Sequence, residues 1–452
     1  MEDYRAYEFK IGKPFRYTDN AEPERYLEKV YEAEAWIRQF QKEDKDGIYW
    51  SIDENKPIDF SFCDGISGLA YFYLELGKAT KNEEYTDIGL KASQYLARNW
   101  RKTLSAKGFF DSPNVELNIA SGTISLATVL LQTYRNYKRD IEEKALREIA
   151  DEILSRKIET GGEITWTDDP TLLFDGGIEL FFIALAETLD SKEYDHAIVA
   201  LVDHILSKEI RDERGGSRWE NLLAGYTLDK RPNFELGTAG VGYILSRAYE
   251  YTHDVKYLEA AERAAKNIRA ISVRRGRGIL VPYRDEPTEG LIFYVATCHG
   301  PAGTSKLFYN LYKLTGKTEY LETIDELYEG LRAIGVPERQ SAGYWNNTCI
   351  CCGTAGTLQF FLNYYNVSGE RKSLEAAIKA GNILLSENEK RVAGRTWPLA
   401  FTRVTPEKIS ETYAYNNGSS GIASALLQLY LTLTTGYKYD KLIDDPYPQK
   451  AI

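Results

Sequence analysis

LGTAGVGYILSRAYEY, residues 236–251, is the clearest of seven copies of one unit in this sequence. The unit is Gly-x-x-Gly followed by a run of apolar or small residues. Its second glycine recurs at positions 68, 177, 240, 303, 356 and 421, and Ser125 takes that place in the second copy. Phe174 replaces the first glycine in the third copy. Successive copies lie 52 to 65 residues apart, a spacing typical of two helices with their loops in each unit.

Two kinds of helix are predicted in each unit. The run after each glycine pair is apolar on nearly all sides, as expected of a buried inner helix. Segments between the runs, such as KYLEAAERAAKNIRAIS (256–272), have apolar residues at i, i+3, i+4 and i+7, typical of a surface helix. The alternation predicts an all-α fold, a seven-fold α/α toroid. We expect one domain over residues 1–452, with the repeats over 63–431 and a segment of about residues 1–40 in the outer layer.

Composition narrows the classes of function. The chain has 452 residues, 43% of them hydrophobic, and a formal net charge of -11. That charge argues against general nucleic-acid binding and against docking on anionic membrane. No apolar run is long enough to span a membrane, and the N-terminus does not resemble a signal peptide. Five cysteines fit a reducing cytoplasm better than a disulfide framework.

Two of the turns before the predicted inner helices contain most of the cysteines. They read TCHGPAG (297–303) and CCGTAG (351–356), and each has a Cys two residues before its first glycine. Free cysteines are often small core residues, and we prefer that interpretation for Cys63. Cys298, Cys351 and Cys352 stand at matching repeat positions, where a ring would gather them. A catalytic zinc ion takes three protein ligands and leaves its fourth position open, so these three thiols predict a metal site.

The glycine-pair helices and the CHG segment resemble the lanthionine synthetase C-like cyclases over roughly residues 40–440. Members of that family are zinc-dependent α/α toroids that add a peptide Cys thiol to dehydroalanine or dehydrobutyrine, which forms a thioether. The resemblance therefore implies a Zn²⁺-dependent cyclase acting on a dehydrated precursor peptide. The dehydratase would be a separate protein, because nothing in this chain resembles one.

The resemblance also implies a ligand set. The family uses a Cys in one turn, then a Cys and a His in a CHG turn one repeat later. In the register of the first glycine, Cys298 matches the earlier Cys, Cys351 matches the later Cys, and Cys352 stands where His is usual. The C-C-G form resembles a subgroup that binds zinc through three cysteines. A rival mapping keeps His299 as a ligand, with Cys298 and one of the other two thiols.

The usual acid/base residues of the family are missing. Leu236 stands where the family has a His, and Tyr294 stands where it has an Arg. A proton donor is still needed, because thiol addition leaves an enolate to be protonated at Cα. We expect His299 to supply that proton, with Tyr294 or Asp169 beside it. The alternative is that His299 is a hydrogen-bonded turn residue without a role in the reaction.

Two other functions compete with the cyclase. The missing histidine suits a toroid of the same family that binds peptides without turnover, or one that forms glutathione-type adducts. A carbohydrate-active α/α toroid would work through paired carboxylates, and Asp64, Asp175 and Glu235 stand near inner-helix turns. The carbohydrate hypothesis leaves the thiol cluster unexplained.

Overall fold

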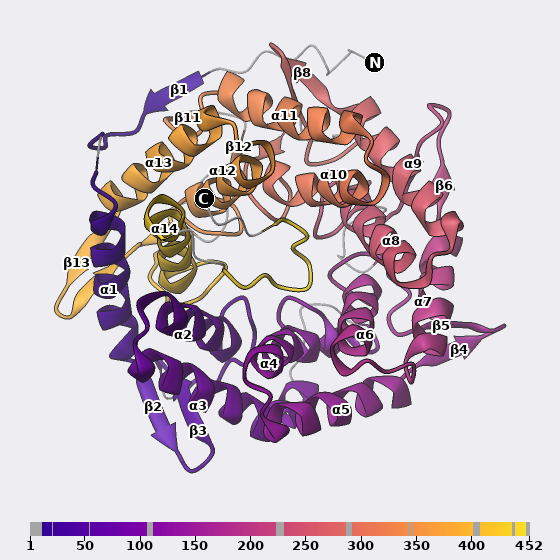
Figure 1. Ribbon diagram of the computed structural model, residues 1–452, viewed down its shortest axis with the longest axis horizontal. Coiled ribbons are helices and arrows are strands. Elements are labelled where there is room, and N and C mark those ends of the chain that lie inside the picture. The colour runs from indigo at the N-terminus through magenta and orange to yellow at the C-terminus, as the bar shows by residue number, and fades with distance from the viewer. Residues whose placement is uncertain are drawn as a thin grey trace.

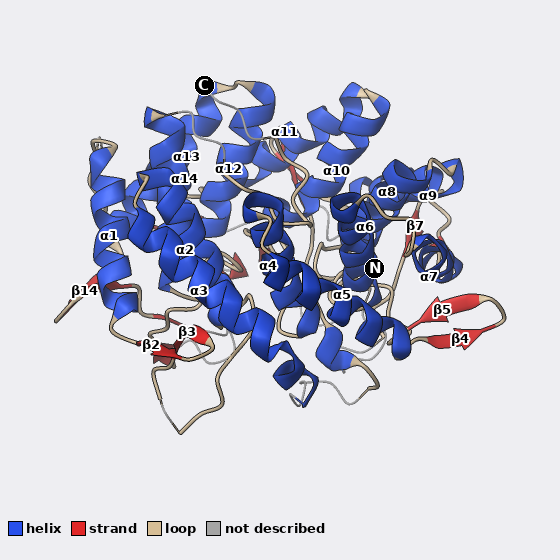
Figure 2. Ribbon diagram, turned by 60° about the horizontal axis from the view of Figure 1, so that its bottom comes forward, coloured by secondary structure: helices blue, strands red, loops and turns tan. Residues whose placement is uncertain are grey.

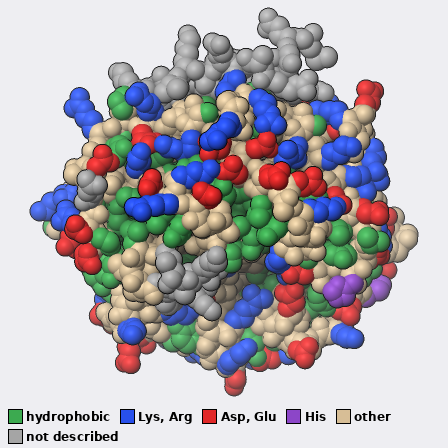
Figure 3. Space-filling view, turned by 45° about the horizontal axis from the view of Figure 1, so that its top comes forward, with side chains coloured by type: hydrophobic (Ala, Val, Ile, Leu, Met, Phe, Trp, Pro, Cys, Tyr) green, Lys and Arg blue, Asp and Glu red, His purple; other side chains and the backbone are tan. Residues whose placement is uncertain are grey.

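The computed structural model describes most of the chain. The described residues are 11–19, 21–53, 55–105, 112–222, 230–285, 292–341, 344–345, 347–400, 407–435 and 439–448. Within them, no helix is both long enough and apolar enough to cross a membrane. On the face shown in Figure 3, basic and acidic side chains are interspersed around apolar patches.

In the described part of the chain, seven helices form the inner layer of a ring (Figure 1). Each begins at the Gly-x-x-Gly unit, and its first two or three turns are almost completely buried. The inner helices are α2 (Ile66–Thr80), α4 (Thr123–Tyr137), α6 (Asp175–Leu189), α8 (Thr238–Thr252), α10 (Pro301–Thr315), α12 (Thr354–Ser368) and α14 (Ser419–Thr434).

Seven amphipathic helices form the outer layer, each with one buried face. They are α1 (Glu24–Arg38), α3 (Glu83–Asn99), α5 (Asp140–Ser155), α7 (Asp195–Ser207), α9 (Val255–Ile271), α11 (Thr318–Ala333) and α13 (Arg371–Ser386). α1 packs on α14, so the first helix of the chain is the outer partner of the last inner helix. α14 also contacts α2 and α12, which closes the ring. The predicted all-α, seven-fold toroid is confirmed.

Short strands connect the outer helices to the turns of the inner ones, and Figure 2 shows β2–β3 and β4–β5 protruding beyond the helices. Antiparallel pairs are β2–β3, β4–β5, β6–β7, β8–β9, β13–β14, β15–β16 and β1–β11, whereas β10 and β12 are parallel. The strands are β1 (Ile11–Pro14), β2 (Gln41–Asp44), β3 (Gly47–Trp50), β4 (Ile158–Thr160), β5 (Glu163–Thr165), β6 (Ile210–Arg211), β7 (Ser217–Arg218), β8 (Val273–Arg275), β9 (Gly278–Leu280), β10 (Phe293–Tyr294), β11 (Arg339–Ser341), β12 (Tyr344–Trp345), β13 (Glu389–Arg391), β14 (Gly394–Thr396), β15 (Leu399–Ala400) and β16 (Ile409–Ser410).

The glycine pairs are needed because each turn folds back onto the start of its own helix. A Cβ on Gly237 would lie 2.1 Å from the carbonyl oxygen of Arg231, and one on Gly240 would lie 1.9 Å from that of Phe234. In both cases the obstructing carbonyl belongs to the residue six positions earlier. Most copies repeat this relation, so the Gly-x-x-Gly pattern records a close approach of backbone to backbone.

Backbone hydrogen bonds join the seven turns into a closed circle, which we call the turn ring. Each turn donates an N–H to a carbonyl of the next, and the last returns to the first, over 2.9 to 3.3 Å. The bonds run from Cys63 to Ala120, Ile119 to Leu173, Leu173 to Glu235, Glu235 to Cys298, Cys298 to Cys351, Cys351 to Asn416, and Asn416 to Cys63. The turn ring fixes the positions of side chains that come from all seven repeats.

The C-terminal segment Tyr439–Pro448, which we call the strap, runs across the middle of the ring (Figure 1). The hydroxyl of Tyr71 in α2 donates to the carbonyl of Asp440 (2.6 Å), and the backbone N–H of Asp440 donates to Glu75 Oε2 (3.2 Å). The ammonium group of Lys78 contacts the Asp440 carboxylate. The strap is thus held inside the ring by polar side chains of the inner layer.

Glu75 predicts a pH dependence of stability. Burial is the largest of the effects that raise its pKa, to about 8. The unfolded chain releases this proton above about pH 4.5, but the folded chain keeps it until about pH 8. The stabilising contribution of Glu75 is therefore complete below pH 4.5 and is lost as the pH rises toward 8, by about 1.4 kcal/mol per pH unit.

Urea unfolding of the wild type and of Glu75→Gln at pH 5.5, 6.5 and 7.5 measures this effect. The stability of the wild type should fall with pH relative to Glu75→Gln. The exposed Glu319→Gln is the matched control and should follow the wild type. Parallel curves for the wild type and Glu75→Gln would contradict the prediction.

Candidate metal centre

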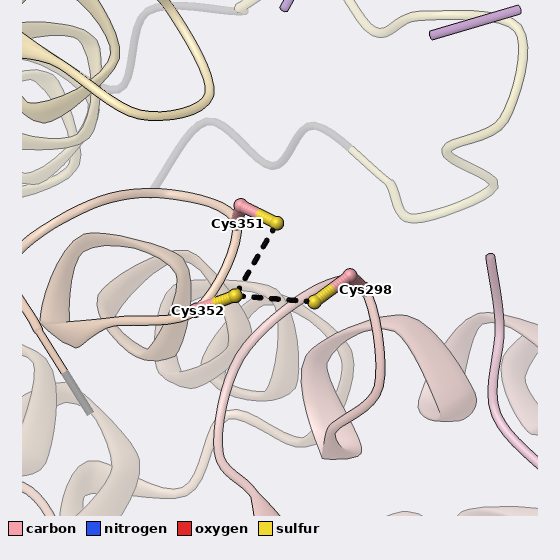
Figure 4. Close-up of side chains that lie close together, drawn as sticks. All are labelled: Cys298, Cys351 and Cys352. Atoms are coloured by element: carbon pink, nitrogen blue, oxygen red, sulfur yellow. Dashed lines mark hydrogen bonds between the residues drawn. The ribbon is translucent and has the colours of Figure 1, made fainter. Parts of the chain in front are cut away.

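Three thiols from two neighbouring turns meet in the turn ring. Cys298 precedes α10, and Cys351 and Cys352 precede α12. The Sγ atoms of Cys298 and Cys352 are 3.4 Å apart, as are those of Cys352 and Cys351 (Figure 4). All three Sγ atoms lie within 4.8 Å of one another. This group could hold a metal ion.

The donor set fits zinc. Thiolates are among the preferred zinc ligands, with Zn–S near 2.3 Å, so two ligands of a tetrahedral site lie about 3.8 Å apart. The observed 3.4 Å separations need only small side-chain shifts to reach that spacing. Three ligands leave one coordination position for a substrate atom.

The three thiols differ in the direction in which their surroundings shift the pKa. Hydrogen bonds from Cys351 and Cys352 lower the pKa of Cys298 to about 6, although burial opposes this. The same interaction raises the pKa values of Cys351 and Cys352 well above the usual thiol value. The cluster therefore holds one negative charge easily and a second or third only with a cation, as expected of a metal-binding thiol group.

Cys349 supports the cluster without joining it. It is fully buried, and its sulfur accepts a hydrogen bond from the backbone N–H of Cys352 at 3.4 Å. Burial raises its pKa to about 12, so it stays a neutral thiol. It packs the turn and helps to orient the backbone that carries Cys352.

His299 lies beside Cys298, in a second group of possible ligands. One of its ring nitrogens, the Cys298 sulfur and a Glu235 carboxylate oxygen lie within 4.8 Å of one another, a group that does not include Cys351 or Cys352. Arg231 Nη1 is 3.5 Å from His299 Nε2, and Nδ1 has no hydrogen-bond partner in the described part of the chain. Burial first, and then the Arg231 charge, lower the pKa of His299 well below its usual value. His299 is a neutral imidazole, and the Arg231 contact assigns its proton to Nδ1.

The other residues predicted from the sequence fall in two places. Tyr294 packs edge-on against His299 with ring centroids 5.3 Å apart, and it stacks on Tyr283 at 4.9 Å. Asp169 is fully buried in the turn before α6. Its carboxylate accepts hydrogen bonds from the Thr171 N–H (2.9 Å) and the Leu222 N–H (2.6 Å). Tyr294 therefore lies next to His299, whereas Asp169 holds a turn in another repeat.

Two site residues went unrecognised in the sequence as neighbours of the thiols. Glu235 and Cys63 each stand two residues before the first glycine of their copy, the register of Cys298 and Cys351. Both line a cavity of about 170 Å³ together with those two cysteines. Burial first, then Cys351, raise the pKa of Glu235 to about 8, and Asn416 Nδ2 donates to Cys63 Sγ at 2.9 Å. The repeat register was the signal that could have found them.

Comparisons with known proteins agree with the fold. The model of the family "Lanthionine synthetase C-like protein" matches residues 175–332 and 237–435, which together span more than half of the chain. Nisin cyclase is 14% identical and has a TM-score of 0.59, over 91% of this chain and 94% of its own. A GH76 α-mannanase of Bacteroides thetaiotaomicron is 12% identical with a TM-score of 0.44, over 74% of this chain and 94% of that one.

A further structural match is the cellobiose 2-epimerase of Bacillus thermoamylovorans, 12% identical with a TM-score of 0.43, over 68% of this chain and 87% of that one. A search of curated proteins finds no significant match.

Proposed function

Because this chain belongs to the lanthionine synthetase C-like family, we propose that it is a zinc-dependent enzyme that forms thioethers. It would add a cysteine thiol to dehydroalanine or dehydrobutyrine in a peptide that a separate dehydratase has prepared. The observation that carries the proposal is the group of three thiols within 4.8 Å, on the wall of a cavity inside the ring.

The three cysteines have the role of metal ligands in this proposal. Cys298, Cys351 and Cys352 would hold the zinc ion, and the turn ring fixes their backbones at the right separation. Bound zinc would lower the pKa of a substrate thiol, so that the thiolate is present near neutral pH. Three anionic ligands donate more charge than two thiolates and a neutral imidazole, which favours a loosely held and nucleophilic substrate sulfur.

Proton delivery falls to His299 and its neighbours. Formation of the C–S bond leaves negative charge on Cα and its carbonyl, and a nearby acid must protonate Cα. His299 would give its Nδ1 proton to Cα while it takes a proton from the Glu235 carboxyl group beside it, which burial keeps protonated near neutral pH. Tyr283 and Tyr294 stack on each other, and both rings contact the imidazole edge to face. This arrangement would take the role of the histidine that the family has at the position of Leu236.

The proposal is tested by metal analysis and a thiol-addition assay. We expect about one zinc ion per chain. A peptide that contains one cysteine and one dehydroalanine should lose its free thiol faster than in buffer, on the order of 10²-fold. Removal of the metal with a chelator should abolish the gain, and added zinc should restore it. Labelling of the remaining thiol and mass spectrometry measure the reaction, because cyclisation leaves the peptide mass unchanged.

The alternative of a peptide-binding protein predicts a different result. Such a protein would contain zinc and bind the dehydrated peptide, but the thiol would disappear at the rate seen in buffer. That outcome would reject the enzymatic proposal.

A further inference from the structure

The strap, Tyr439–Pro448, contacts at least five inner helices. Besides Tyr71, Glu75 and Lys78 of α2, its partners are Asn136 of α4, Tyr243 of α8, Lys306 and Tyr309 of α10, and Asn363 of α12. Lys306 Nζ is 2.8 Å from Asp444 Oδ2, and Lys441 Nζ donates to Asn363 Oδ1 at 3.0 Å. Tyr447 stacks on Tyr309 with ring centroids 4.7 Å apart. A segment with this many partners is a fixed part of the interior.

These partners explain polar residues that the inner helices would not otherwise need. Lys306 is only 7% exposed, and its ammonium group also lies 4.9 Å from the centre of the Phe234 ring. A buried ammonium without a counter-charge is strongly unfavourable. Asp444 supplies that charge, so the Lys306 side chain and the strap require each other.

The strap and the metal centre face the same cavity. Leu442, Ile443 and Asp444 of the strap line it together with Cys298 and Cys351. Its walls are largely apolar, with Phe62, Ile119, Leu172, Phe234, Ile350 and Tyr415. A space of about 170 Å³ has room for about six water molecules at about 30 Å³ each, which matches one or two small amino-acid residues.

We propose that the strap is the floor of the substrate pocket, so that one or two residues of a peptide enter the ring and the chain does not thread through it. The inference rests on the proposed function for the identity of the substrate. The strap would then select small residues, such as dehydroalanine, by limiting the depth of the pocket. Its acidic side chains are paired with Lys78, Lys306 and Lys441, and its Leu442 and Ile443 give the cavity an apolar lining for a small unsaturated side chain.

Thiol labelling tests the floor without any turnover. Cys63 lines the cavity and lies outside the proposed ligand set, so its alkylation in the zinc-loaded protein reports access to the interior. In the full chain, a bulky maleimide should label Cys63 slowly. Deletion of residues 436–452 should raise that rate at least tenfold, whereas zinc content stays unchanged because the strap holds no proposed ligand. Cys63→Ser identifies the labelled site.

A double substitution at the strap gives a second test that does not depend on the folding of the deletion variant. Lys306→Met combined with Asp444→Asn removes a buried pair without leaving one charge alone, and it should raise Cys63 labelling at least threefold. The matched control is Lys372→Met with Asp325→Asn, which removes an outer-layer pair at 2.7 Å and should leave labelling unchanged. Equal labelling of the wild type and the Lys306/Asp444 variant, with circular dichroism showing both folded, would overturn the proposal.

Substrate selectivity tests the part of the inference that depends on the proposed function. The ratio of thiol-addition rates for a dehydrophenylalanine peptide and a dehydroalanine peptide should rise at least threefold in the same variant. A full chain without thiol addition would reject the proposed function, and the labelling result would still decide whether the strap closes the interior.

Discussion

We expect each of three alanine variants to lose the bound zinc, which should fall from about one per chain to less than about 0.1, and to lose thiol addition on the order of 10³-fold. The variants are Cys298→Ala, Cys351→Ala and Cys352→Ala. The reason is that a tetrahedral site with three protein ligands loses most of its affinity when one anionic ligand is removed. Dialysed protein, metal analysis and the thiol-addition assay measure the effect.

Controls of the same chemistry are available close by. Cys349→Ala and Cys63→Ala remove thiols near the cluster that are not proposed ligands, and both variants should keep zinc. His299→Ala decides between the two ligand sets: it should keep zinc but lose activity if three thiolates bind the metal. Loss of zinc in His299→Ala, with zinc retained in Cys351→Ala or in Cys352→Ala, would favour the rival set and contradict the prediction.

Among the glycines that the structure describes, Gly421 should be the one where a change to alanine is most damaging. A Cβ at Gly421 would lie 1.8 Å from the carbonyl oxygen of Tyr415 and 2.8 Å from Ile350 Cγ1. Because Tyr415 packs on Phe62 of the first repeat and Ile350 precedes α12, the clash falls where the last repeat meets both of its neighbours in the ring. We expect a loss of about 3 kcal/mol or more in the free energy of unfolding, a large part of an ordinary total of about 5 to 15 kcal/mol.

Gly316→Ala measures the cost of an unfavourable backbone conformation alone, without a steric clash of the added Cβ. Gly316 ends α10 with φ at 68°, and nothing lies within 4 Å of the added Cβ. It should cost only about 1 kcal/mol, the strain of a left-handed alanine. Urea unfolding of both variants measures the difference. Equal losses would show that the approach to Tyr415 is relieved by a backbone shift.

The second copy shows how the same position accepts a side chain. Ser125 stands where six copies have glycine. Its hydroxyl accepts a hydrogen bond from the Phe62 N–H at 3.2 Å and donates to the Gly122 carbonyl at 2.7 Å. The side chain of Ser125 therefore forms hydrogen bonds with the neighbouring backbone and does not clash with it. The sequence pattern does not reveal this substitution of one contact by another.

The sequence alone was sufficient to predict the toroid and the close approach of the three thiols. Helix periodicity is a local property, and the repeat register places Cys298 and Cys351 in neighbouring turns because every repeat folds alike. The neutral state of His299 depends on Arg231, and Asp169 is held by hydrogen bonds from Thr171 and Leu222, so neither could be predicted from the pattern. The same holds for the carboxylate of Glu235.

The strap is the clearest feature that required the folded chain. Its sequence, YDKLIDDPYP (439–448), has neither helical periodicity nor a repeat register. Its position comes from contacts such as Tyr71 with Asp440 and Lys306 with Asp444, between residues 369 and 138 positions apart. Those contacts exist because the ring brings the inner faces of all repeats around one axis. A pattern of one repeat identifies which faces are buried, but the partners of polar groups on those faces appear only when the ring is closed.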